Sequence, residues 1–155
     1  ANVHTHLTQG GTLGDLRGLT AKEYEAMFLV GHTLYGQKRY EDAEQVFAFL
    51  VMNNPYDRRF AQALGSAKQM LGQYADAIGY YSIASMFEMT DPVPTFHTAE
   101  CLAALGKPED ALDALGFVIK HSNKPEHDKL KHRAQAMIEL LKATSPASAT
   151  AGGTK

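Results

Sequence analysis

A repeat of 34 residues is the feature that most restricts how this chain can fold. Identical residues return at this spacing along the chain: Gly31 and Gly65, Tyr40 and Tyr74, Ala43, Ala77 and Ala111, and Gly72 and Gly106. A repeat of this length indicates small units that cannot bury their apolar faces alone and therefore stack on one another. The chain is thus predicted to be built from similar units in a row.

The residues within the repeat indicate a pair of antiparallel helices. An alanine followed four positions later by a large side chain lets two helices pack closely, and it occurs three times: Ala43 with Phe47, Ala77 with Tyr81, and Ala111 with Leu115. This spacing and a 34-residue period are typical of the tetratricopeptide repeat. We therefore predict an all-α fold, an α-solenoid of three such repeats. The expected helices are 21–36, 39–52, 55–71, 73–88, 92–105 and 108–121.

Capping signals place several helix starts. Thr20 with Glu23 forms the pattern of a capping box, in which side chain and backbone cap each other. Asn54 followed by Pro55 predicts an N-cap with proline at the first helical position, and Pro108 predicts another start.

A further helix is expected from Pro125, and it predicts the domain organisation. Its apolar residues recur at helical spacing on one stripe, which suits a helix that covers the last repeat: Leu130, Ala134, Met137, Ile138 and Leu141. We expect an N-terminal segment over 1–20 and a repeat domain with this capping helix over 21–142. The small polar residues of 143–155 predict a disordered tail.

Composition and charge argue against several partners. The chain has 155 residues and a formal net charge of −2, so it lacks the basic field that attracts proteins to nucleic acid. No apolar run approaches the roughly 18 residues of a membrane span, and no secretory signal is visible. The single cysteine, Cys101, cannot form an internal disulfide. These observations favour the cytoplasm.

A second stripe on the first repeat helix predicts where a partner binds. Phe28, His32 and Tyr35 lie at i, i+4 and i+7 on one stripe of the helix. At about 100° per residue, this stripe is displaced by roughly a third of a turn from the stripe that faces the partner helix. The first helix of each repeat lines a concave groove, so this stripe and its equivalents are the predicted peptide-binding residues: Phe28, His32, Tyr35, Arg59, Gln62, Ser66, Gln69, Phe96 and Glu100. Rings supply apolar area there and polar groups set the register of the peptide. The alternative is that Phe28 and Tyr35 are ordinary core residues.

Other candidate sites have weaker patterns. His4 and His6 could bind a metal, but no cysteine or acid accompanies them on what is expected to be an unstructured end. His97, Glu100 and Cys101 share a helix without an oxyanion donor or a group that orients a base. We therefore expect no metal, no cofactor and no enzymatic activity.

Several short motifs, in order, resemble one protein family. They are the GGTL turn at 10–13, YEDAEQVF at 40–47, YDRRF at 56–60, LGQY at 71–74, AIGYYS at 77–82 and FHTAECL at 96–102. Through these motifs the chain resembles the class II chaperones of bacterial type III secretion systems. The resemblance implies an all-α protein that holds a translocator protein in the cytoplasm and prevents its aggregation and premature association before secretion. It also implies that the groove grips an extended, proline-containing segment of the translocator near Phe28, Tyr35 and Phe96.

Three alternatives remain at this point. The chain could be a general adaptor built from these repeats, or a structural subunit of a secretion or pilus assembly. A scaffold that captures C-terminal carboxylates would need Lys and Asn where this chain has Phe28 and His32.

Members of the resembled family usually carry a longer helix before the GGT turn, whereas nine residues precede Gly10 here. We therefore expect a monomer or a weak homodimer.

Overall fold

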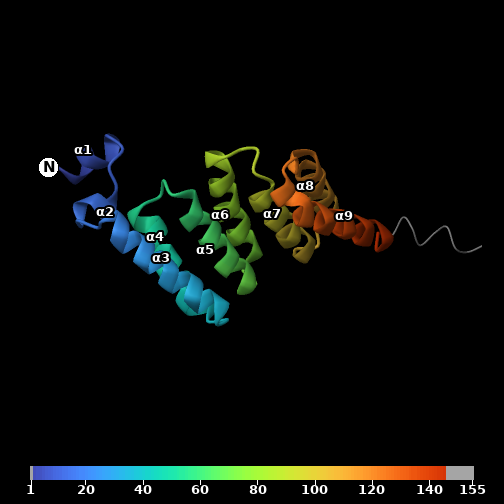
Figure 1. Cartoon of the computed structure of the whole chain (residues 1–155), viewed down its shortest axis with the longest axis horizontal. Coiled ribbons are helices and arrows are strands. Elements are labelled where there is room, and N and C mark those ends of the chain that lie inside the picture. Colours follow the sequence, from blue (N-terminus) through green and yellow to red (C-terminus); the bar gives the residue numbers. More distant parts are fainter. Residues whose placement is uncertain (1, 146–155) are drawn as a thin grey trace, which may run out of the picture. The chain divides into compact units, whose positions relative to one another are not determined.

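The computed structural model describes residues 2–145, and within this range every regular element is a helix (Figure 1). The elements pack into two units, Ala1–Phe87 and Glu88–Lys155, which are described separately. The predicted all-α class is confirmed for the described part of the chain.

Unit 1 contains two short N-terminal helices and two helix pairs. The short helices are α1 (Val3–Thr8) and α2 (Leu13–Leu16). The first pair is α3 (Ala21–Gly36) with α4 (Tyr40–Asn53), and the second is α5 (Arg58–Met70) with α6 (Tyr74–Phe87). Helix α3 packs on α4, α4 also packs on α5, and the contact between α5 and α6 is the most extensive of the three.

Unit 2 contains the third pair and the terminal helix. The pair is α7 (Pro92–Ala104) with α8 (Pro108–His121). A short 3₁₀ helix η1 (Pro125–His127) leads into α9 (Asp128–Ala143), which packs on α8. The helix predicted from Pro125 therefore begins with one tighter turn.

The observed helix starts confirm some capping predictions and correct one. Thr20 and Glu23 form the predicted capping box, with the Thr20 side chain accepting from the backbone of Glu23 and the Glu23 carboxylate accepting from the backbone of Thr20. Pro108 begins α8 as expected. The expected start of α5 at Pro55 is wrong, because Asp57 is the N-cap and accepts a hydrogen bond from the backbone of Arg59.

The turn inside each helix pair needs one residue with positive φ. Gly72 and Gly106 occupy it in the second and third pairs, at φ of 75° and 73°. Lys38 occupies the equivalent position of the first pair at φ 61°. A side chain in this left-handed region costs roughly 1 kcal/mol that glycine avoids. The sequence repeat thus extends to the turns, with one strained exception.

The core of unit 1 is formed where the paired helices cross. Gly31 on α3 lies so close to the Phe47 ring that an added methyl group would overlap it, and Phe47 is buried. Phe60 and Leu64 of α5 complete the same cluster, with Leu50 of α4. The small residue at this crossing is therefore Gly31, while Ala43, the small residue predicted for it, is buried in the same cluster.

The N-terminal segment docks on α4 through α2. Gly14 contacts Tyr24 so closely that a methyl group would overlap the phenol oxygen, and Arg17 Nη1 donates to Asn53 Oδ1 at 2.9 Å. The His4–His6 stretch, expected to be unstructured, lies in helix α1, which Asn2 caps. The sequence gives little indication of this helix because none of its six residues is fully buried.

The core of unit 2 joins α7, α8 and α9. Phe96, Leu115 and Ala134, one from each helix, are buried in one cluster, and the apolar stripe of α9 packs against it. The role of α9 as a covering helix for the third pair therefore agrees with the prediction. Of the predicted tail 143–155, Ala143 ends α9, and residues 146–155 lie outside the described part of the chain.

Candidate functional site

The predicted stripe on α3 lies along one side of unit 1. Phe28 and Tyr35 are half-buried and His32 is exposed. The rings of Phe28 and His32 meet edge to face with centroids 4.4 Å apart. The Phe28 ring also contacts Phe60, at 5.4 Å between centroids. Phe28 therefore packs against the core and leaves part of its ring exposed, while its role in peptide binding stays a prediction.

Tyr35 extends this row toward the end of α3. Its ring packs against Tyr40 at the start of α4, with centroids 5.2 Å apart, and contacts the core cluster of unit 1. A tyrosine at such a place offers an apolar ring with a polar tip.

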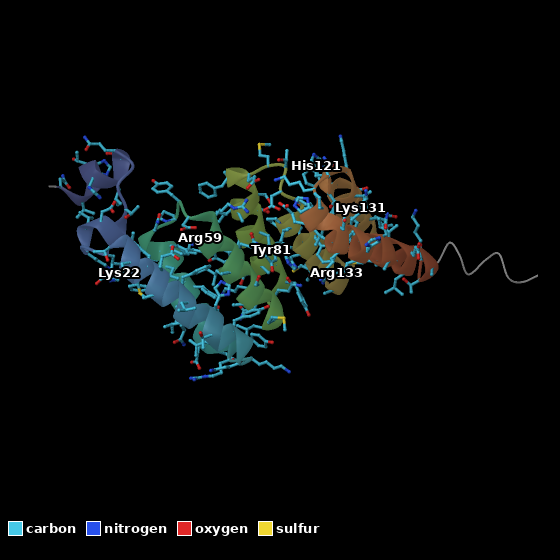
Figure 2. All side chains as sticks on the ribbon, viewed as in Figure 1. Lys22, Arg59, Tyr81, His121, Lys131 and Arg133 are labelled. Carbon is cyan, nitrogen blue, oxygen red and sulfur yellow. The ribbon has the colours of Figure 1, made fainter. Side chains whose placement is uncertain are left out.

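Arg59 joins the start of α5 to α3. Its guanidinium group pairs with Glu25 of α3 at 2.6 Å and with Asp57 at 2.7 Å, and lies 5.2 Å from the centroid of the Phe28 ring. The hydrogen bond from Arg59 lowers the pKa of Glu25, and the bonds to Asp57 and Glu25 raise the pKa of Arg59. A positive charge therefore lies over the Phe28 ring at the edge of the stripe. Figure 2 labels Arg59.

The equivalent residues of α5 form a second, polar row. Gln62, Ser66 and Gln69 are half-buried at i, i+4 and i+7. The Ser66 hydroxyl donates to the carbonyl of Gln62 at 3.1 Å, and the hydroxyl of Tyr81 from α6 donates to Gln69 Oε1 at 2.7 Å. We call these two rows the α3–α5 surface: Phe28, His32, Tyr35, Arg59, Gln62, Ser66 and Gln69.

The α3–α5 surface has the chemistry needed to bind a peptide. Three rings from α3 supply apolar contact area, while amide and hydroxyl groups from α5 supply hydrogen-bonding positions. Arg59 links the two helices through its ion pair with Glu25. The pairing of Arg59 with Glu25 across 34 residues was not predicted from the sequence.

Unit 2 places its predicted residues differently. Phe96 is 2% exposed and belongs to the core, and the Arg133 guanidinium group of α9 lies 4.6 Å from its centroid. The expectation of an accessible Phe96 is therefore wrong for this structure, because α9 covers it. Glu100 is half-buried and connects His97 Nδ1, at 2.8 Å, with Arg133, at 3.0 Å.

The structure also shows the surroundings of the weaker candidates: His6 Nε2 lies 3.6 Å from Asp15 Oδ2, although no acid was expected to accompany it. Burial raises the pKa of Cys101 to about 11, so its thiol stays protonated at neutral pH, whereas a reactive thiol has a lowered pKa. Within residues 2–145, no three His, Cys, Asp or Glu side chains are grouped closely enough to hold a metal ion.

An apolar hollow on α3 and α4 was not predicted from the sequence. It has a volume of about 600 Å³ and is lined by Met27, Val30, Leu34, Arg39, Asp42, Gln45, Val46 and Phe49. Val30 of α3 does not pack against the partner helix and is 53% exposed. The reason is that Gly31, the next residue, occupies the crossing point with Phe47.

Among the described helices, none is both long and apolar enough to cross a membrane.

Comparisons with known proteins agree with the repeat architecture. The model of the tetratricopeptide repeat family matches residues 28–53. The low calcium response locus protein H of Yersinia pseudotuberculosis is 33% identical over 142 residues, which cover 90% of this chain and 84% of that protein.

Solved structures extend the similarity to three dimensions. A type III secretion complex from Aeromonas hydrophila has a TM-score of 0.85 and 32% identity, covering 91% of this chain and 95% of the other. The Yersinia enterocolitica type III secretion chaperone SycD, in complex with a peptide of the translocator YopD, has a TM-score of 0.76 and 34% identity, covering 80% and 95%. SycD is also described as an alternative dimer, with a TM-score of 0.77 and 33% identity over 80% and 95%. The chain therefore belongs to the family of type III secretion translocator chaperones.

Proposed function

We propose that this protein is a chaperone that binds a translocator of a type III secretion system and holds an extended segment of it on the α3–α5 surface. One observation carries the proposal: half-buried and exposed rings of α3 lie beside a polar row of α5 on one unit. Relatives of this chain include SycD, which is described in complex with a translocator peptide. The chaperone would act in the bacterial cytoplasm, keeping the translocator from aggregating before secretion.

The proposed mode of binding is non-covalent and needs no catalysis. Apolar side chains of the segment would lie against Phe28 and Tyr35, and its backbone would meet the amide groups of Gln62 and Gln69. A few aromatic anchors usually dominate the energy of such an interface. The proposal concerns unit 1 alone; in unit 2 Phe96 is 2% exposed, and Glu100 stays a separate prediction from the sequence.

The proposal is tested by measuring binding and stability on the same variants. Phe28→Ala and Tyr35→Ala should each lower the affinity for a synthetic YopD peptide by about 5- to 150-fold, corresponding to about 1–3 kcal/mol. His32→Ala should weaken binding with little effect on melting, because His32 is exposed. Lys22→Ala, on an exposed part of α3, is the control (Figure 2). Calorimetric titration and thermal melting give the two quantities.

Two results would contradict the proposal. If none of the three stripe variants binds the peptide differently from Lys22→Ala, the peptide does not use this surface. If Phe28→Ala and Tyr35→Ala lose affinity only in proportion to a loss of folded protein, and His32→Ala has no effect, these rings are core residues alone.

We further propose that the hollow on α3 and α4 supports weak self-association. Val30 and Phe49 expose apolar area there, and SycD is described as an alternative dimer. Val30→Glu should shift the protein toward the monomer in sedimentation equilibrium. A wild-type protein that is monomeric at high micromolar concentration would refute this assignment.

A further inference from the structure

The connection between α8 and α9 carries an excess of positive charge. Residues 120–133 contain five cations and two acids, a net charge of +3, although the whole chain carries −2. Helix α9 packs on α8, and only residues 122–124 separate the end of α8 from η1. Four lysines surround this corner of unit 2, and we call them the α8–α9 lysine cluster: Lys120, Lys124, Lys129 and Lys131. Figure 2 labels Lys131.

The ammonium groups of this cluster are not neutralised within the described part of the chain. None of the four forms an ion pair there, and neither do Glu126 and Asp128, the two acids of the same segment. The fifth cation, Arg133, is different because it pairs with Glu100 of α7 at 3.0 Å. Three of the four lysines are exposed, and Lys131 is half-buried. Their charges are therefore available to an anion from outside the chain.

The position of Lys129 opposes local stability. It lies in the first turn of α9, where the partial positive charge of the helix N-terminus disfavours a cation, and it offsets the favourable charge of Asp128 beside it. Helices α4 and α8 carry two acids each in this turn. Arg59 also lies near a helix start, but Asp57 and Glu25 neutralise it. A cation kept without a partner at an unfavourable position is typical of a functional surface.

The surface around the cluster is polar. Within the described residues, no large apolar side chain between 106 and 139 is exposed, and the nearest exposed ones are Leu105 and Leu140. A helix that binds a membrane surface needs exposed apolar side chains that enter the lipid. Single-stranded nucleic acid is usually bound with the help of exposed rings that stack on the bases. An acidic polypeptide needs only complementary charge, so it is the partner that this surface fits best.

We propose that the α8–α9 lysine cluster binds an acidic, extended segment of a partner protein through charge complementarity. Ammonium groups spread over two helix ends match carboxylates that are spaced along an extended chain. Lysine side chains are long and flexible, so the contact does not require one fixed geometry of the partner. The inference is independent of the proposed function, because the α3–α5 surface belongs to unit 1.

The test measures binding of a labelled synthetic peptide of alternating Glu and Ser to the full chain by fluorescence anisotropy. Affinity for the wild type should fall several-fold as the ionic strength rises from about 0.01 M to about 0.15 M, because salt screens exposed charges. The combined variant Lys120→Gln, Lys124→Gln and Lys129→Gln should bind about five- to tenfold more weakly at low salt, since each exposed ion pair contributes a small share. It should not melt below the wild type, because a cation is removed from a helix N-terminus.

A second triple variant separates this surface from the overall charge of the protein. It removes the same number of positive charges from exposed lysines elsewhere: Lys22, Lys107 and Lys142, each replaced by Gln. The two triple variants have the same net charge, so any effect of net charge on peptide binding is the same in both. The second variant should bind the peptide with about the affinity of the wild type.

Three results would overturn the inference. If the wild type does not bind the Glu and Ser peptide at low salt, the surface does not recognise acidic polypeptide. If both triple variants lose the same affinity, binding follows net charge and not the α8–α9 lysine cluster. If the wild type binds a single-stranded oligonucleotide of equal charge, or vesicles containing phosphatidylserine, more tightly than the peptide, and the first triple variant loses that binding, the cluster serves another class of partner.

Discussion

The contact between Gly14 and Tyr24 makes a demanding test of how the N-terminal segment docks. A methyl group on Gly14 would overlap the Tyr24 hydroxyl oxygen and would lie 2.8 Å from the ring carbon that carries it and 3.0 Å from the Asn53 carbonyl. Tyr24 is 9% exposed and stacks on Phe60, so it has little room to move. Gly14→Ala is therefore expected to be destabilising despite the higher helix propensity of alanine.

The magnitude follows from two opposing effects. Forcing a methyl group into a packed site costs about 1–3 kcal/mol, and this site is tight enough for the upper end. Alanine recovers up to about 1 kcal/mol in a helix. The net loss of about 2 kcal/mol should lower the melting temperature by about 4–8 °C for a chain of this size.

The strain can also be relieved by release of α1 and α2. Their docking depends on few contacts, among them the hydrogen bond from Arg17 to Asn53. If release costs less than the strain, melting changes little but the amides of residues 3–16 lose their protection against hydrogen exchange. Both quantities must therefore be measured on Gly14→Ala, with Gly79→Ala as the control because nothing lies within 4 Å of its added methyl group.

A second variant tests whether the Tyr24 hydroxyl is the cause of the destabilisation expected for Gly14→Ala. The buried Tyr24 hydroxyl finds no hydrogen-bond partner among the described residues, and burial raises the pKa of this phenol. Tyr24→Phe alone should be neutral or stabilising, and combined with Gly14→Ala it should restore part of the loss. Unchanged melting and unchanged amide protection in Gly14→Ala would refute the reasoning.

Three further predictions concern single residues. Gly79→Ala and Gly116→Ala lie inside helices with open space around the added methyl group, so each should raise the free energy of unfolding by about 0.5–1 kcal/mol in urea titration; a decrease would contradict the packing described. Hydrogen bonding from the Thr20 backbone lowers the pKa of Glu23 below its ordinary 4.5, so its stabilisation is present above that pH and is lost as the pH falls through the folded-state pKa. Glu23→Gln should therefore melt below wild type at neutral pH and converge with it in acid, and a constant difference would count against the capping box. Because Cys101 is buried and its pKa is raised to about 11, a thiol reagent should modify it only in denaturant; rapid reaction of the native protein would show that the site opens.

The regular part of the fold could be predicted from the sequence because its determinants are local. The repeat of alanines and large side chains defines where helices cross, and capping by Thr20 and the proline at Pro108 define two starts. The start of α5 could not be placed as well, since both Asn54 and Asp57 suit an N-cap and only the structure distinguishes them. Helix α1 has only Val3 and Leu7 at helical spacing and buries neither, so the sequence gives little indication of it.

The candidate site depends on contacts between distant residues, which the repeat pattern does not encode. Phe28 and Phe96 are equivalent in sequence, yet α9 covers Phe96 with Arg133, whereas the Phe28 ring stays half-buried beside Arg59. Periodicity identifies the face of a helix but not what lies on top of it. All members of the α3–α5 surface stay predictions until binding is measured.

The order of helix packing has a consequence for how the protein is made. Neighbouring helices in the sequence are also the main packing partners within each unit, which gives the fold short-range topology. Helical proteins of this kind fold in microseconds to milliseconds. Synthesis of residues 88–143, which contain α7, α8 and α9, takes about 3 to 11 seconds at typical elongation rates. We therefore expect the α3–α5 surface to be folded on the ribosome while α7, α8 and α9 are still being translated.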